Sequence, residues 1–212
     1  MLVFSKEKLV FLSMPKTGST AYVEALAPRA SLVLREPPEL KHAPIYRFDR
    51  FFRKPVERFM GEGFDILAVM REPVDWLGSW YRYRRRPHTK GSATSTLEID
   101  FDTFVEGYLC PKKPAFAKIG SQAKFLEPTK DGLAASHVFR YEDQSGLRAF
   151  LEDRLDFEFE TQKRNVSPEM QTSLSASLKA RLKEDYAADF RLYAQIEDAG
   201  RYTPLPHGIA KR

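Results

Sequence analysis

The chain has 212 residues, of which 42% are hydrophobic and 13% aromatic, so a packed core is expected and wholesale disorder is excluded. Lysine and arginine number 34 against 29 acidic residues, and this net charge of +5 favours an anionic ligand without specifying its kind. The single cysteine, Cys110, excludes an intrachain disulfide and a cysteine-based zinc site.

The hydropathy pattern gives no sign of a membrane or secretory segment. Mean hydropathy is −0.45, and no apolar run approaches the roughly 18 residues that cross a bilayer. Residues 1–8 lack an apolar stretch followed by a small-residue cleavage site. We therefore expect a soluble protein of a reducing compartment, the cytoplasm, with no membrane partner and no nucleic-acid partner.

Apolar runs and helical spacings alternate along the chain. Continuously apolar runs predict buried strands at 9–13, 31–34, 66–70 and 137–141. Helical spacing predicts helices at 19–26, 73–84, 101–109 and 147–155, and Ser167 followed by Pro168 is typical of a helix start. A C-terminal apolar stripe predicts a helical core face at Met170, Leu174, Leu178, Leu182, Tyr186, Phe190 and Tyr193.

This alternation predicts an α/β fold: a three-layer sandwich around a central, mostly parallel sheet. No repeat or linker divides the chain, so residues 1–212 are expected to form one domain. In such sheets ligands bind at the carboxyl ends of the strands, where both informative loops lie. The segments 43–62 and 87–120 are interpreted as loops that select the substrate, and 87–100 as a mobile one.

The first informative loop follows the strand predicted at 9–13. It carries Lys16, Thr17, Gly18, Ser19 and Thr20 immediately before a helix. Free amides at a helix N-terminus, a glycine that permits close approach, two kinds of hydroxyl and a lysine together predict a phosphate-type anion site. A Walker A loop is excluded because Lys16 precedes the only glycine, whereas that motif places lysine after its second glycine.

The second informative segment follows the strand predicted at 66–70. Arg71 closes the strand, Pro73 begins a helix, and Ser79 lies two turns into it. An arginine can chelate a phosphate through its planar fork, and a serine hydroxyl can donate one further hydrogen bond. Alone this pattern is weak, since the arginine could cap local carbonyls instead.

The two segments together resemble the sulfotransferases that use 3′-phosphoadenosine-5′-phosphosulfate (PAPS), with a P-loop-like fold of the bacterial or carbohydrate-acting type. Three further segments are similar to that family: 140–143 (Arg-Tyr-Glu-Asp), 165–167 (Asn-Val-Ser) and the helix at 186–193 with Asp189 and Phe190. Gln122 resembles a family position near the acceptor, on a looser match. The resemblance spans about residues 9–193.

The resemblance implies roles for individual residues. Lys16 would contact the oxygen between phosphate and sulfate, while Thr17, Gly18, Ser19 and Thr20 would bind the 5′-phosphate. Arg71 and Ser79 would bind the 3′-phosphate and so favour PAPS over ATP. The implied activity is in-line transfer of a sulfuryl group from PAPS to a hydroxyl or amine, with 3′-phosphoadenosine 5′-phosphate (PAP) as product and no metal.

The acceptor hydroxyl needs a general base, and His42 is the candidate because it follows the second predicted strand. Some subgroups of the family use glutamate at this step, so histidine and carboxylate stay open. Lys41 could assist. The basic run at 82–86 could attract an acidic acceptor or simply form the polar end of a helix.

Two other functions stay open on the residues alone. One is a nucleotide kinase or NTPase with an atypical phosphate loop, and the other is a non-catalytic module that binds an anion or RNA through 82–86. The acceptor is expected to be a small molecule or carbohydrate, with a phenol, a sugar and a protein tyrosine all possible. The sequence does not indicate the oligomeric state, or whether activity is retained.

Overall fold

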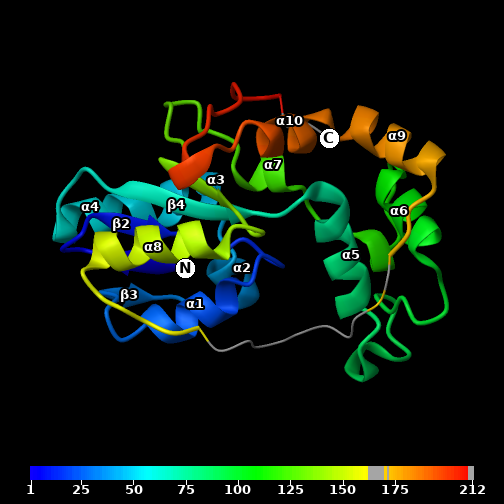
Figure 1. The fold of residues 1–212 in the computed structure, drawn as a ribbon, viewed down its shortest axis with the longest axis horizontal. Helices are drawn as coiled ribbons and strands as arrows, with labels where there is room; N and C mark the ends of the chain where they lie inside the picture. The colour runs from blue at the N-terminus through cyan, green and yellow to red at the C-terminus, as the bar shows by residue number, and fades with distance from the viewer. Residues whose placement is uncertain (162–169, 171, 210–212) are drawn as a thin grey trace.

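The computed structural model describes residues 1–161, 170 and 172–209, and Figure 1 shows a single sheet flanked by helices. Five strands form the sheet: β1 (Leu2–Phe4), β2 (Leu9–Phe11), β3 (Leu32–Val33), β4 (Asp65–Met70) and β5 (His137–Arg140). Their order across it is β3-β1-β2-β4-β5. Strands β2, β4 and β5 pair in parallel, so their carboxyl ends meet at one edge.

The helices have the following bounds, in chain order: α1 (Ser19–Leu26), α2 (Pro38–Lys41), α3 (Ile45–Phe48), η1 (Asp49–Arg53), α4 (Lys54–Met60), α5 (Pro73–Tyr83), η2 (Pro87–Thr89), α6 (Phe101–Leu109), η3 (Ala115–Ala117), α7 (Gln122–Phe125), α8 (Gln144–Leu155), α9 (Ala176–Asp185), α10 (Ala187–Ala194) and η4 (Asp198–Gly200). Among the described residues, none of these is long and apolar enough to span a membrane.

Alternate side chains of the strands point into two separate cores. On one face, residues such as Phe11 and Val69 pack against α1 and α8. On the other face, residues such as Val10 and Ala68 pack against α3, α4, α7 and α10. The sheet therefore lies between two helical layers, and the three-layer α/β arrangement that the sequence predicted is present.

A third core lies beyond the carboxyl ends of the parallel strands. Helices α5, α6 and α9 pack together there, on the right in Figure 1. Trp76, Tyr81 and Phe104 are among its buried side chains. Helix α5 begins shortly after β4, so it connects this helical cluster to the edge of the sheet where the two informative loops begin.

The predicted strands and helices at 9–13, 19–26, 31–34, 66–70, 73–84, 101–109, 137–141 and 147–155 are confirmed, with small shifts of their ends. Strand β1 was not predicted. It runs antiparallel to both of its neighbours, so the sheet is mixed, and the predicted parallel pairing holds only among β2, β4 and β5. Its three residues are fully buried, because Val3 packs into the core on one face of the sheet while Leu2 and Phe4 pack into the core on the other.

The prediction of a loop across 43–62 was wrong for most of its length. Residues 45–60 are helical, through α3, the π-helical turn η1 and α4. The segment is helical because apolar residues recur in it at helical spacing. Three of them, Ile45, Phe48 and Val56, are buried against the sheet. The segment 87–100 does contain mainly turns, although Thr96 is fully buried and its hydroxyl donates to the carbonyl of Tyr81.

The C-terminal stripe is confirmed where α9 meets the helical cluster, since Leu178, Leu182 and Tyr186 are buried. The prediction was wrong for Met170, which is 37% exposed and precedes α9 without belonging to it. The predicted helix start at Ser167, and the segment 165–167 with it, lie outside the described residues.

Candidate functional site: an anion loop at the sheet edge

The loop between β2 and α1 has an unusual backbone. Lys16 and Gly18 both have positive φ, at 68° and 71°, and Gly18 is the N-cap of α1. A Cβ at position 18 would lie 3.1 Å from the ring of Tyr141, so the ring and the φ value both select glycine. The left-handed lysine is the costlier feature, because a side chain disfavours this conformation.

This conformation leaves a row of backbone donors available. In the described part of the chain, the amides of residues 16–20 donate no hydrogen bond to another group, and the first helical amide with a partner is that of Ala21. Among the described residues, no side chain caps the helix. Successive free amides at the start of a helix form a concavity that favours an anion, and this is the backbone feature on which the prediction of an anion site depends.

The hydroxyls of this loop serve the loop itself. Thr17 Oγ1 and Ser19 Oγ donate to the carbonyl of Met14, at 2.9 and 3.3 Å. Thr17 is fully buried and Ser19 is 4% exposed. Thr17 and Ser19 could therefore contribute to anion binding mainly through their backbone amides. The hydroxyl of Thr20 does not bond to the loop; its Oγ1 accepts a hydrogen bond from Lys41 Nζ at 3.4 Å.

Lys16 is held among aromatic rings and other cations. Its Nζ lies 4.3 Å from the centre of the Tyr83 ring and 5.9 Å from that of Trp80. Burial, together with repulsion from Arg86, Arg71 and Arg82, lowers the pKa of Lys16 to about 7. An anion bound at the loop would offset this repulsion.

Arg71 reaches the loop from the carboxyl end of β4. Its Nη1 donates to the carbonyl of Lys16 at 3.4 Å, and its Nε donates to Asp75 at 2.6 Å. The guanidinium lies 4.2 Å from the centre of the Tyr141 ring, whose edge faces Gly18. The structure therefore brings the two predicted motifs together, with Tyr141 from the end of β5 between them.

Asp75 and Ser79 lie on the same side of α5, four residues apart. Asp75 accepts hydrogen bonds from Arg71 and, at 3.2 Å, from Arg82. This leaves Arg71 Nη2 with no partner in the described part of the chain. Ser79 is 6% exposed, and among the described residues its hydroxyl makes no hydrogen bond. An arginine fork and an unused hydroxyl are therefore available two turns of helix apart.

A buried carboxamide holds the backbone of Arg71, and the sequence did not predict this role. Gln122 Oε1 accepts from the Arg71 amide at 2.9 Å, and Gln122 Nε2 donates to the Arg71 carbonyl at 2.7 Å. The amides of Gln122 and Ala123 in turn donate to Asp189 Oδ1 at 2.7 and 3.0 Å. Both side chains lie far from Arg71 in the sequence, so no local pattern could reveal the chain of contacts.

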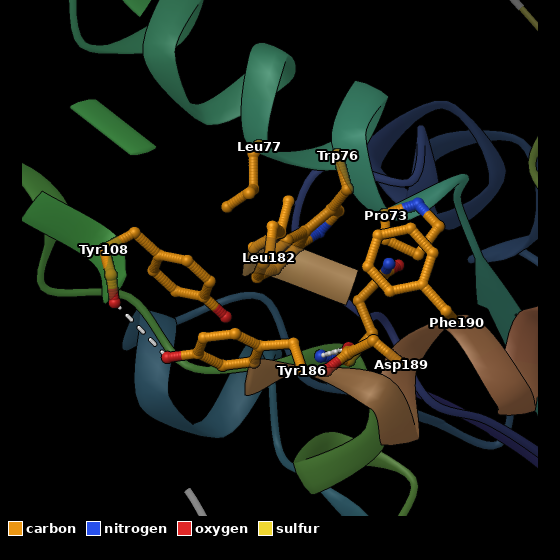
Figure 2. A pocket seen from close by; sticks show the side chains of 9 residues that line it. Pro73, Trp76, Leu77, Tyr108, Leu182, Tyr186, Asp189 and Phe190 are labelled. Carbon is orange, nitrogen blue, oxygen red and sulfur yellow. Dashed lines mark hydrogen bonds between the residues drawn. The ribbon is translucent and has the colours of Figure 1, made fainter. Parts of the chain in front are cut away.

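Figure 2 shows the side chains that pack next to these hydrogen bonds, where Trp76, Leu77 and Tyr108 face Leu182, Tyr186 and Asp189. The cavity among these side chains is about 10 Å³, room for about one water molecule and far too small for a nucleotide. Burial raises the pKa of Asp189 to about 6. The cavity is therefore part of the core that supports the site and is not the site itself.

His42 follows α2 and packs against the strand that precedes the loop. Its Nδ1 lies 2.6 Å from the carbonyl of Ser13, so Nδ1 carries the proton and Nε2 is left with a free lone pair. Burial lowers the pKa of His42 despite this hydrogen bond, and Lys41 and Lys16 lower it further. A neutral imidazole with a free Nε2 is suited to accept a proton.

The basic run at 82–86 divides into two groups. Arg84 donates to the carbonyls of Ala115, Phe116 and Lys118. Arg85 donates to the carbonyls of Thr96 and Ile99 and to the Tyr81 hydroxyl. These two arginines hold the neighbouring loops in place, a role that neither interpretation of the run included, whereas Arg82 and Arg86 contribute positive charge around Lys16.

The segment 140–143 supports the same edge of the sheet. Glu142 accepts from the amide of Glu72 at 3.0 Å and from the Tyr193 hydroxyl at 2.9 Å, so it ties β5 to the start of α5 and to α10. In the described part of the chain, no cluster of three or more histidine, cysteine or acidic side chains could hold a metal ion.

Comparison with known proteins assigns no family. No protein-family model matches the chain, and no curated protein has a matching sequence. The geometry above is therefore the basis of the functional proposal.

Proposed function

We propose that this chain is a P-loop-like, PAPS-dependent sulfotransferase that moves a sulfuryl group to a hydroxyl or amine acceptor. One observation carries the proposal. Two anion-binding motifs, from the ends of β2 and β4, lie against one another, since Arg71 Nη1 donates to the Lys16 carbonyl at 3.4 Å. A ligand with two separate phosphate-type groups matches two adjacent motifs of this kind.

The side chains present fit PAPS at both ends. The free amides of residues 16–20 and the cation of Lys16 suit the 5′-phosphosulfate. The Arg71 fork and the unused Ser79 hydroxyl suit the 3′-phosphate, and Gln122 keeps the Arg71 backbone in place. ATP has no 3′-phosphate, so it would leave the second motif unused.

PAPS supplies an activated sulfuryl group attached to its 5′-phosphate. During transfer, negative charge develops on that phosphate. Lys16 and the N-terminus of α1 lie at the same loop, so both would stabilise the developing charge without rearrangement. Sulfuryl carries less charge than phosphoryl, which reduces the need for a metal ion.

His42 would take the proton of the acceptor. The Ser13 carbonyl fixes the Nδ1–H tautomer, so Nε2 is the atom that accepts. The lowered pKa keeps the imidazole neutral at neutral pH and ready to act as a base. Lys41, which reaches Thr20 at 3.4 Å, adds positive charge between the base and the loop.

The test is calorimetric titration of PAP and of ATP without magnesium. Wild-type protein is expected to bind PAP much more tightly than ATP. Arg71→Ala and Lys16→Ala should each weaken PAP binding by about ten- to a hundredfold, because each removes a charge-assisted hydrogen bond. Arg181→Ala, an exposed cation on α9, is the matched control and should bind as wild type does.

Sulfate transfer from PAPS to phenol, sugar and tyrosyl-peptide acceptors would then define the acceptor, and His42→Asn should lower its rate with little effect on PAP affinity. Absence of PAP binding would refute the proposal. Magnesium-dependent ATP turnover would indicate a kinase or NTPase instead, and salt-sensitive RNA binding would indicate a binding module.

A further inference from the structure

The outer face of the helical segment 45–60 carries aromatic side chains that the fold leaves uncovered. Phe59 is 81% exposed, Phe51 54% and Tyr46 45%. In the described part of the chain, the only other large apolar side chains with comparable exposure are Met170 and Ile209. Phe51 and Phe59 lie eight residues apart with Pro55 midway, so the three form one apolar line along the helix.

A line of cations runs beside this apolar line. Arg50, Lys54 and Arg58 are exposed and are also spaced four residues apart. The two carboxylates of the segment do not neutralise them, because Arg53 holds both Asp49, at 3.3 Å, and Glu57, at 2.8 Å. Within the described residues, Arg50, Lys54 and Arg58 form no ion pair, so the face presents a net positive charge.

We propose that this face, the outer side of α3–η1–α4, binds the surface of an anionic lipid bilayer. A helix lying in the plane of a membrane needs an apolar line that enters the boundary of the acyl chains and cations that meet the lipid phosphates. Phe51 and Phe59 supply the first, and Arg50, Lys54 and Arg58 supply the second. The opposite side of the helix is fixed to the core by Ile45, Phe48 and Val56.

A bilayer fits these side chains better than a nucleic acid does. Binding to single-stranded nucleic acid relies on open aromatic faces on which bases stack. Here the Arg50 guanidinium lies 5.2 Å from the centre of the Phe51 ring, and that of Arg58 lies 5.9 Å from the centre of the Phe59 ring. Each arginine covers a ring face, while its long side chain can still reach a phosphate above the membrane.

This inference differs from the expectation of no membrane partner. That expectation came from the lack of a long apolar run, which bears only on helices that cross a bilayer. A surface helix needs no such run. The inference does not rest on the proposed sulfotransferase activity, because none of its residues belongs to the anion loop or to α5, but they do lie in the segment 43–62 that the sequence assigned to substrate selection.

The experiment is co-sedimentation of the full chain with vesicles in 0.1 M salt. One set contains phosphatidylcholine alone, and the other contains about 30% phosphatidylglycerol. Wild-type protein is expected to bind the anionic vesicles only. Arg50→Gln, Lys54→Gln and Arg58→Gln together should weaken binding more than a hundredfold, since each cation near an anionic leaflet contributes about fivefold. Phe51→Ser with Phe59→Ser should weaken it at least about tenfold.

The matched control removes the same charge elsewhere. Lys179→Gln, Arg181→Gln and Lys183→Gln together neutralise three exposed cations on α9, with no exposed large apolar side chain on that helix. This variant should sediment as wild type does. Circular dichroism melting verifies that each variant is folded, which is expected because all the substituted side chains are exposed.

Three results would overturn the proposal. Lack of wild-type binding to the anionic vesicles is the first. An equal loss in the α9 control is the second, because it would mean that overall charge and not this face is responsible. Full retention of binding in the Phe51 and Phe59 double variant is the third, and strong binding to a single-stranded oligonucleotide in its place would identify the face as a nucleic-acid surface.

Discussion

Binding of an anion at the loop is expected to be coupled to proton uptake by Lys16. The pKa of this lysine is lowered to about 7, so at pH 8 about 90% of the free protein carries it neutral. A bound 5′-phosphate would favour the charged form and raise that pKa again. Binding of PAP at pH 8 should therefore take up about 0.9 proton, and affinity should fall by up to about tenfold per pH unit above pH 7.

Calorimetry measures this uptake directly. The apparent binding enthalpy of PAP at pH 8 should depend linearly on the ionisation enthalpy of the buffer, with a slope of about 0.9 proton taken up. Phosphate monoesters are already fully ionised at pH 8, since their second pKa is about 6, so the ligand does not give a false signal. Lys16→Arg keeps the charge but does not titrate, and its slope should be near zero.

His42 is the other titratable group whose pKa Lys16 affects, and it needs its own control. His42→Asn should keep the proton uptake of the wild type, because its ring is already neutral at pH 8 and lies outside the loop. A wild-type slope near zero, or an unchanged slope in Lys16→Arg, would refute the reasoning about Lys16.

Four further outcomes are expected. Gly18→Ala should destabilise the fold by about 1–2 kcal/mol in chemical denaturation, through its positive φ and the contact 3.1 Å from Tyr141, and should weaken PAP binding. Gln122→Ala should cost about 2–4 kcal/mol, since it leaves both backbone groups of Arg71 without partners, and should weaken PAP binding about tenfold. Arg84→Ala should lower stability by about 3 kcal/mol or more, because three loop carbonyls lose their donor, while PAP affinity in a calorimetric titration stays within about twofold of wild type. Burial raises the pKa of Asp189 from 3.8 to about 6, so the protonated side chain stabilises the folded state fully below pH 4 and this stabilisation is lost as pH rises through 6. The free energy of unfolding of wild type should therefore fall over this pH range relative to that of Asp189→Asn, and chemical denaturation at several pH values measures the difference.

The sequence predicted the central strands because burial on both faces requires continuous apolar runs, as in β4. It did not predict β1, whose three residues are too few to show a period and are followed by a polar turn at 5–8. The direction of β1 could not be predicted either, because only its place between β2 and β3 decides it.

The helices at 38–60 were not predicted because this segment contains three prolines, which usually indicate a break in helical structure. Pro38 lies in the first turn of α2, and Pro44 is the N-cap of α3, where the missing amide proton has no cost. Pro55 is different, because it lies within continuous helical structure. The π-helical turn Asp49–Arg53 directly precedes α4, and such a turn changes the hydrogen bonding where Pro55 has no proton to donate.

The candidate site was predictable where its residues follow strands directly. Lys16 and Arg71 follow β2 and β4, and the parallel pairing of these strands brings them together. The supporting residues were not predictable in the same way. Gln122 and Asp189 act through backbone contacts with partners 51 and 67 residues away, which depend on how α7 and α10 pack on the sheet.

Several costly features of this molecule lie at one edge of the sheet. They are a lysine with positive φ, a row of amides that have no partner among the described residues, and a buried cation close to three arginines. Each lowers stability on its own. An anion bound at the loop would offset all three. On the proposed function, this cost is preorganisation for the anionic ligand. Lys16→Met should then raise the melting temperature, most strongly below pH 7, where the buried lysine is charged, and should weaken PAP binding.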